Sequence, residues 1–233
     1  MAKKRQPIRR RRSGQAPQFE RQTNWLVIGG IVVGSLIFLA GLMWLAWRPQ
    51  TASARSLSVY CADNEGSCIT LGSETAPVTI VEVSDYGCPH CRTFNLETAP
   101  LLDETYIKTG QVRWLVLPFA LGPQTTPTAA ATMCAAEQDA FPAFHIAMFE
   151  MQDAPDALTR AGFMAAAENL DLDLERFGTC VDSNRYNKTV QDNSQAATRA
   201  GVTGTPTFFI NDVALEGAHP FGAFQQRISP LLN

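Results

Sequence analysis

The chain of 233 residues lacks internal repeats and low-complexity tracts, and charged residues make up only 18% of it. Its 45% of hydrophobic residues and formal net charge of −3 exclude a collagen-like, wholly disordered or miniature disulfide-scaffold protein. Acidic residues are nearly absent from residues 1–48, where Glu20 stands against nine lysines and arginines, so this segment carries +8. Residues 49–233, with ten basic and 21 acidic side chains, carry −11. A basic segment therefore precedes an acidic body that is long enough for one domain.

Charged residues are also absent from the 23 residues between Trp25 and Trp47, these two included. At about 1.5 Å per residue, a helix over this run reaches roughly 34 Å and can cross the hydrocarbon of a bilayer. The excess of basic residues before it places the N-terminus in the cytoplasm. We expect a single-pass anchor in the cell membrane, with everything after Arg48 extracytoplasmic. A cleaved signal peptide is the alternative, because residues 52–54 resemble a cleavage site, although the run is about twice a usual signal-peptide core.

Six cysteines in an exported acidic domain indicate disulfides, because the surroundings outside the membrane are oxidising. Four of them lie apart from the closely spaced pair and allow three pairings. We favour Cys61 with Cys68, which share a short polar loop, and Cys134 with Cys180, which lie in helical-looking segments of one region. A redox relay through Cys61 and Cys68 is the alternative to a structural bridge.

Cys88 and Cys91 form a C-x-x-C pair at a predicted junction of strand and helix. Residues 77–83 are typical of a buried strand, residues 84–87 of a turn, and residues 91–109 of a helix with an interruption near its proline. The unpaired N–H groups and the positive dipole end of a first helical turn stabilise a thiolate. The position therefore predicts that Cys88 is a reactive nucleophile and Cys91 its shielded partner.

The two residues between these cysteines fit the same interpretation. Pro89 suits a first helical turn because its missing N–H would be unpaired there, and His90 can add a donor or a positive charge. A C-x-x-C can also be half of a zinc site, but no second one follows, and His145 and His219 lie at no ligand spacing. We expect no metal. A structural bridge or metal site in a non-enzymatic module remains an alternative.

Two further features concern the same chemistry. Glu82 is a carboxylate within the apolar strand, where an ionised group is costly without a partner or a task. It can lie beneath the helix start and exchange a proton with Cys91; an acid at an exposed strand edge is the alternative. Further on, residues 201–211 are a glycine-rich loop that enters a strand at Pro206, a residue that cannot donate to a ladder.

The strand with Glu82, the Cys88-Pro89-His90-Cys91 motif and the Thr205-Pro206 strand start together resemble the thioredoxin fold, specifically the DsbA-like thiol-disulfide oxidoreductases of bacterial envelopes. The resemblance covers about residues 70–233. It implies an α/β thioredoxin-like fold with an inserted helical subdomain, here at about residues 124–190. It also implies that Pro206 is cis and faces the redox pair, and that the backbone of Thr205 pairs with a bound substrate strand.

What the resemblance implies about function is dithiol-disulfide exchange without a dissociable cofactor. We expect a membrane-tethered oxidase that introduces disulfides into reduced exported polypeptides. Its implied partner is a membrane quinone-linked thiol oxidase of the DsbB or vitamin K epoxide reductase type, in a bacterial cell membrane, and no nucleic acid is involved. An isomerase or reductase on the same fold is the alternative, because DsbA-type oxidases often have Val at the position of Thr205 and isomerase-like relatives often have Thr.

The predicted organisation has four parts, which are a basic cytoplasmic segment over 1–24, a transmembrane helix over 25–47, a linker with an N-terminal extension over 48–76, and the thioredoxin-like domain over 77–233. Within the domain we expect strands over 78–84, 112–117, 207–210 and 213–215, and a final amphipathic helix over 221–232.

Overall fold

The computed structural model describes residues 25–46, 51–211 and 213–232, so the basic segment 1–24 and the end of the predicted membrane helix lie outside the described residues. The chain divides into two units, residues 1–49 and residues 50–233. The first holds helix α1 (Trp25–Ala46), within which the side chains of residues 28–39, 41 and 43 are described. Within the described part of the chain, no helix is both long enough and apolar enough to cross a membrane.

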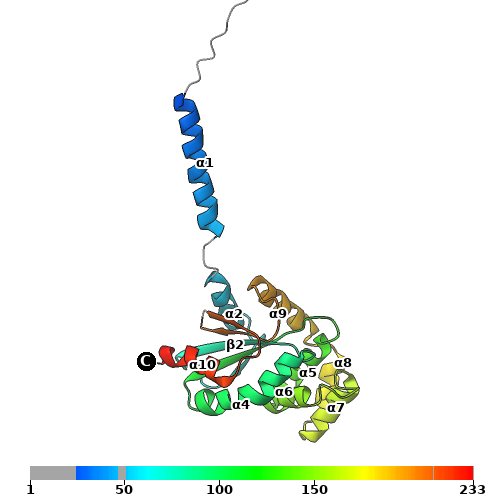
Figure 1. Ribbon diagram of the computed structural model, residues 1–233. Helices are drawn as coiled ribbons and strands as arrows, with labels where there is room; N and C mark the ends of the chain where they lie inside the picture. Colours follow the sequence, from blue (N-terminus) through cyan, green and yellow to red (C-terminus); the bar gives the residue numbers. More distant parts are fainter. Residues whose placement is uncertain (1–24, 47–50, 212, 233) are drawn as a thin grey trace, which may run out of the picture. The chain divides into compact units, whose positions relative to one another are not determined.

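The second unit is built on a five-stranded sheet with the order β1-β3-β2-β4-β5. Figure 1 labels strand β2 of this sheet and the helices of the unit. Central strands β2 and β3 pair in parallel, and the other neighbours pair antiparallel. Both central strands are buried on both faces, which explains their nearly continuous apolar sequences. The strands are β1 (Ile69–Leu71), β2 (Val78–Ser84), β3 (Val112–Pro118), β4 (Thr207–Ile210) and β5 (Val213–Glu216). Four of these match the predicted strands, whereas β1 was not predicted.

One helical stretch follows β2 and packs on one face of the sheet. It runs through α3 (Pro89–Thr93), η1 (Phe94–Thr98), α4 (Ala99–Leu102) and η2 (Asp103–Ile107), of which η1 and η2 are π-helical turns. Pro100 lacks an N–H and crowds the preceding turn, and the wider η1 turn lies directly before it. The interruption predicted near this proline is therefore a change of helix type rather than a break.

The apolar side chains alternate between the two faces of the sheet, as a strand period of two requires. On the face that carries this helical stretch, Phe94 packs against Phe208 and Phe224, the last from α10 (Phe221–Ile228). On the other face, Leu115 and Phe209 pack with apolar residues of α2 and α9. A short 3-10 turn, η3 (Ser229–Leu231), follows α10, so the predicted final helix over 221–232 is largely correct.

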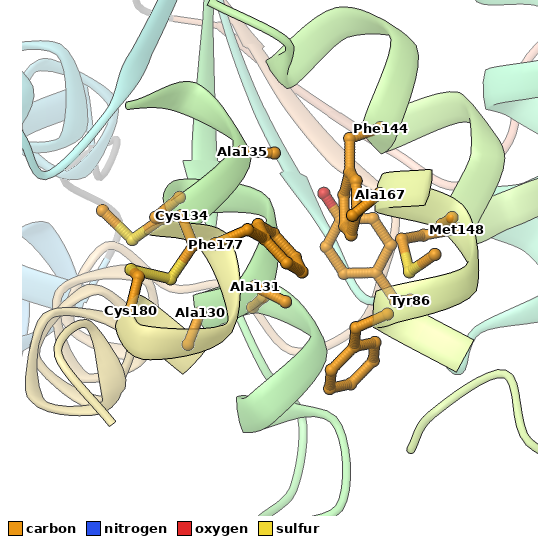
Figure 2. Close-up of a cluster of buried hydrophobic side chains, with 14 of the residues drawn as sticks. Tyr86, Ala130, Ala131, Cys134, Ala135, Phe144, Met148, Ala167, Phe177 and Cys180 are labelled. Carbon is orange, nitrogen blue, oxygen red and sulfur yellow. A yellow bond between two sulfur atoms is a disulfide. The ribbon is translucent and has the colours of Figure 1, made fainter. Parts of the chain in front are cut away.

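The helical subdomain lies between β3 and β4 and extends to residue 199, further than the predicted end near 190. Its core contains Phe144, Met148 and Phe177, and Figure 2 shows Phe177 with the Cys134–Cys180 disulfide on one side and Phe144 on the other. The helices are α5 (Thr126–Ala136), α6 (Phe141–Glu150), α7 (Arg160–Asn169), α8 (Leu174–Asp182) and α9 (Asn187–Arg199).

The interpretation of residues 48–76 as linker and extension needs a correction. Helix α2 (Thr51–Asp63) places Leu57 at 0% exposure in the core that it shares with α9, and β1 pairs with β3. The compact unit begins at Gln50 rather than at residue 77. The reason is that short elements with few apolar residues give a weak pattern, although Leu57 is fully buried once α9 covers it.

Candidate active site

Cys88 and Cys91 stand where β2 has turned into α3. Cys88 is the extended N-cap residue of α3, its carbonyl accepts the first helical hydrogen bond from Arg92 N at 3.1 Å, and Pro89 occupies the first turn. The Cys91 side chain points inward and is fully buried, while Cys88 is half-buried. Both are free thiols in this structure. The chain thus offers one accessible and one shielded sulfur, the arrangement expected from the sequence.

The two sulfurs differ sharply in acidity. A hydrogen bond from the Cys91 thiol, helped by the backbone N–H groups of Cys91 and His90 and opposed by burial, lowers the pKa of Cys88 to about 5. Burial raises the pKa of Cys91 far above its ordinary range. The imidazole of His90 is exposed, and it is the backbone of this residue that contributes. At neutral pH the reduced pair therefore holds a thiolate at Cys88 and a thiol at Cys91.

The loop before β4 reaches the same point. The Thr205–Pro206 bond is cis, as the resemblance implied. The carbonyl oxygen of Thr205 lies 3.3 Å from Cys88 Sγ, within reach of a hydrogen bond from the protonated thiol. Cys88 and Thr205 are 117 positions apart in the chain and are neighbours in the fold.

Glu82 lies in the middle of central strand β2 with 0% exposure, so the alternative of an exposed strand edge is wrong. Burial raises its pKa, and hydrogen bonds from Ser84 and Asn95 partly offset that rise. Both donors bind Oε1, Asn95 Nδ2 at 2.9 Å, and the Trp114 side chain also acts to lower the pKa of Glu82. The same Asn95 Nδ2 donates to the carbonyl of Cys91 at 3.1 Å, and so connects Glu82 to the backbone of the shielded cysteine.

The turn before Cys88 is held by Asp85, which is almost completely buried. One of its oxygens accepts from Gly87 N at 2.7 Å, and the other accepts from Leu121 N at 2.7 Å and from Thr125 Oγ1 at 2.6 Å. Its backbone N–H donates to Cys91 Sγ at 3.4 Å. Asp85 therefore ties the redox turn to the loop after β3.

Known proteins share the fold that carries this site. The sequence model of the family described as thioredoxin matches residues 64–229. The chain belongs to the thioredoxin family. Among its relatives is the Disulfide bond formation protein D of Bacillus subtilis, 26% identical over 169 residues, which cover 70% of this chain and 76% of that protein. The crystal structure of alpha-DsbA1 from Wolbachia pipientis is 25% identical, with a TM-score of 0.65 over 72% of this chain and 92% of that one. The matched thioredoxin-family domain is a DsbA-like thiol-disulfide oxidoreductase.

One further relative is named as an antiporter and not as a disulfide bond formation protein. The Na(+)/H(+) antiporter NhaA 3 of Salinispora tropica is 36% identical over 198 residues, which cover 77% of this chain. The chain spans only 29% of the length of that antiporter. Because the match covers less than a third of the antiporter, ion transport is not carried over to this thioredoxin-family protein.

The four remaining cysteines form the pairs that the sequence favoured. Cys61 and Cys68 are bonded across a separation of seven residues, and Cys134 and Cys180 across 46. The second bridge is buried inside the helical subdomain, whereas the first is partly exposed. Among the described residues, no cluster of three or more His, Cys, Asp or Glu side chains is arranged to hold a metal ion.

Three residues of this site were not predicted in their roles. Gln152, after α6, donates to the carbonyls of Tyr86 at 2.6 Å and Cys88 at 3.2 Å, and so holds the redox turn from the helical subdomain. Asn95 and Asp85 lie within seven residues of Cys88, where an inward polar residue on an apolar helix and an Asp opening a turn are recognisable signals. Gln152 lies 64 residues from Cys88, and no local pattern indicates it.

Proposed function

We propose that this protein is a membrane-tethered, extracytoplasmic oxidase that introduces disulfides into exported proteins through Cys88 and Cys91. One observation carries the proposal, which is the pKa of about 5 for Cys88 beside a buried, protonated Cys91. Stabilising the Cys88 thiolate favours the reduced pair over the disulfide, and so makes the disulfide a stronger oxidant. It also makes Cys88 a good leaving group in the step that releases product.

Thiol-disulfide exchange at Cys88 proceeds in two steps. A substrate thiolate attacks Cys88 Sγ in the oxidised pair, the bond between Cys88 and Cys91 breaks, and Cys91 takes the electron pair and then a proton. A second thiolate of the substrate attacks its own sulfur in the mixed disulfide, and Cys88 leaves as a thiolate. The substrate loses two electrons and the pair gains them. Because burial raises the pKa of Cys91, that sulfur needs a proton as soon as it is released.

Glu82 is the group that we assign to this proton. Its carboxyl is buried with a raised pKa, so it holds a proton more readily than an exposed carboxyl does. Asn95 connects it to the Cys91 backbone through two hydrogen bonds of one amide group. We infer that Glu82 supplies the proton to Cys91 when the mixed disulfide forms and regains one from solvent afterwards.

The membrane tether and the partners belong to the same proposal. Support for the tether comes from the uncharged run over residues 25–47 and the basic residues before it. The substrates are reduced exported polypeptides that approach the half-buried Cys88 and the Thr205 backbone. The two electrons must leave again, and we propose a quinone-linked membrane thiol oxidase of the DsbB or vitamin K epoxide reductase type as their acceptor.

A second candidate is an isomerase or a reductase with the same pair. Thr205 supports it, since isomerase-like relatives often have Thr before the cis-proline. The candidates differ in the direction of electron flow, which the reduction potential of the pair measures.

The test is therefore the redox equilibrium of the full chain against glutathione, with a Cys88→Ser/Cys91→Ser double variant to correct for the two other disulfides. An oxidase should have a potential close to the roughly −120 mV of DsbA. A value near the roughly −270 mV of thioredoxin would reject the oxidase and favour the reductase.

A further inference from the structure

A buried histidine of the helical subdomain contacts the side chain that links Glu82 to Cys91. His145 on α6 is 5% exposed, and the rings of Phe141 and Phe149 lie beside it, each with its centroid 5.1 Å away. Its Nδ1 lies 2.6 Å from the hydroxyl of Tyr86, and its Nε2 lies 2.9 Å from Oδ1 of Asn95. The exchange steps above do not use His145, although both of its ring nitrogens are engaged.

The hydrogen bonds of Asn95 determine which atoms carry the protons between Tyr86 and Glu82. Asn95 Nδ2 has two hydrogens, and both are used, one toward Glu82 Oε1 and one toward the Cys91 carbonyl. The atom of Asn95 that faces His145 is therefore the amide oxygen, which can only accept, so His145 Nε2 must carry the proton. Burial lowers the pKa of His145 to about 3, so the ring is neutral and its Nδ1 is an acceptor. Tyr86 donates to it, and all donors point in one direction, from Tyr86 through His145 and Asn95 to Glu82.

We propose that His145 is a positioning residue which holds the amide of Asn95 in one orientation, with its N–H groups on Glu82 and on the carbonyl of Cys91. The inference rests on the proposed exchange function and deepens it, because it gives the helical subdomain a part in the proton step. Without the Nε2 donor, the Asn95 amide can rotate. Its oxygen would then face the carbonyl of Cys91, acceptor against acceptor, and Glu82 would lose a donor.

Rotation of the Asn95 amide would change the pH at which Glu82 titrates. Losing the donated N–H disfavours the ionised carboxylate, so the carboxyl should retain its proton to a higher pH. Other titratable groups face this region as well. Cys91, Asp85 and Tyr86 lie on the redox side, and Asp103 and Lys108 line the same cavity of about 460 Å³ as Glu82 and His145. The effect of His145 must therefore be separated from theirs by variants that leave all of them in place.

The first measurement is the tautomer of His145 in the full chain, from nitrogen-15 spectra of histidine-labelled protein. The chain has three histidines, so a single His145→Gln variant assigns the signal. We expect a neutral ring with its proton on Nε2 throughout the neutral pH range. A proton on Nδ1, or a charged ring, would reverse the chain of donors and overturn the inference.

The second measurement compares three variants of the full chain. His145→Phe keeps an aromatic ring but removes both the Nε2 donor and the Nδ1 acceptor. His145→Gln keeps a donor and an acceptor, and Phe141→Leu disturbs the packing around the imidazole without touching a hydrogen bond. In His145→Phe we expect the side-chain amide of Asn95 to lose its protection from hydrogen exchange by about tenfold or more, as the loss of one such bond implies. The carbon-13 titration of Glu82 should also move to higher pH. Both should be restored in His145→Gln and unaffected in Phe141→Leu.

The outcomes separate the inference from the proposed function. If Asn95 and Glu82 respond in Phe141→Leu as they do in His145→Phe, the role of His145 is packing and the inference fails. If Asn95 and Glu82 respond only in His145→Phe, and the pH profile of mixed-disulfide formation does not change in that variant, His145 positions Asn95 as proposed. In that case Glu82 is not the proton donor to Cys91. If His145→Phe does not fold, two other results still test the proposal. A proton on Nδ1 in the parent protein contradicts it, and so does a titration of Glu82 that changes in His145→Gln.

Discussion

At the scale of single residues, the contrast between Cys88 and Cys91 predicts which sulfur bonds to substrate. Cys88 is half-buried and ionised at neutral pH, while Cys91 is fully buried with a raised pKa. In a Cys91→Ala variant, substrates should therefore accumulate as mixed disulfides on Cys88, because the resolving thiol is missing. Mass spectrometry of the trapped complexes checks this. Adducts found on Cys91 in a Cys88→Ala variant, and none on Cys88, would reverse the assignment.

The acidity of Cys88 also predicts how stability depends on pH. An unfolded thiol titrates near 8.5, and the folded Cys88 has a pKa of about 5. This lowered pKa stabilises the reduced fold fully above about pH 8.5, and the contribution is lost as the pH falls through about 5. The oxidised form has no such group. At pH 7 the reduced protein should thus melt a few degrees above the oxidised protein, and the difference should vanish or reverse below about pH 4.

Calorimetric scans of both redox forms across this range measure the effect, with Cys88→Ser as the control that lacks the thiolate. An oxidised form that melts higher at pH 7, together with a Cys88 thiol that titrates near 8, would remove the basis of the oxidase proposal.

At the scale of elements, the burial of α2 predicts that residues 51–63 stabilise the domain. Leu57 is at 0% exposure in the core shared with α9. Replacing it by Ala should lower the free energy of unfolding by about 2–5 kcal/mol, as in other buried leucines. Val59 on the same helix is 52% exposed, and Val59→Ala is the matched control with an expected effect below about 0.5 kcal/mol. Equal small effects in a urea titration would mean that α2 is a linker after all.

The two disulfides should contribute unequally, because they close loops of different length. The Cys134–Cys180 bridge spans 46 residues and the Cys61–Cys68 bridge spans seven. In the loop-entropy account, replacing both cysteines of the longer bridge by Ala should cost about 4 kcal/mol, and the shorter about 2.5 kcal/mol. Denaturant unfolding of the two double variants tests this order. If removal of Cys61–Cys68 instead changed the reduction potential of Cys88/Cys91, that bridge would be a redox relay.

At the scale of the whole molecule, the two units should be separable. Residues 50–233 form a compact unit that contains the complete redox site. A chain that begins at Gln50 should therefore fold and exchange disulfides at a rate within about twofold of the full chain, since the site contacts described above all lie within residues 50–233. It should lose its attachment to membranes if residues 25–47 are an anchor. Fractionation of cells that express both chains measures this, and equal release of both into the soluble fraction would contradict the tether.

Much of this protein could be determined from the sequence alone, where the signal is local. The strands over 78–84 and 207–210 carry continuous apolar runs, and the Cys88-Pro89-His90-Cys91 spacing follows the first of them directly. Local hydrogen bonding and periodicity decide such features within about ten residues, so a linear pattern records them. The pairing of the other four cysteines could also be predicted, because four cysteines allow only three pairings.

The tertiary structure alone decided what depends on distant partners. Glu82 could lie at an edge or in the centre, and only the pairing of β2 with β3 and β4 buries it. Gln152 and His145 reach the redox turn and Asn95 because α6 packs against the helical stretch that begins at Cys88, and no residue near them in sequence indicates this. Leu57 became core only when α9 covered it. A side chain far along the chain acquires its role from the packing that surrounds it, since burial and hydrogen-bond partners are properties of the folded molecule.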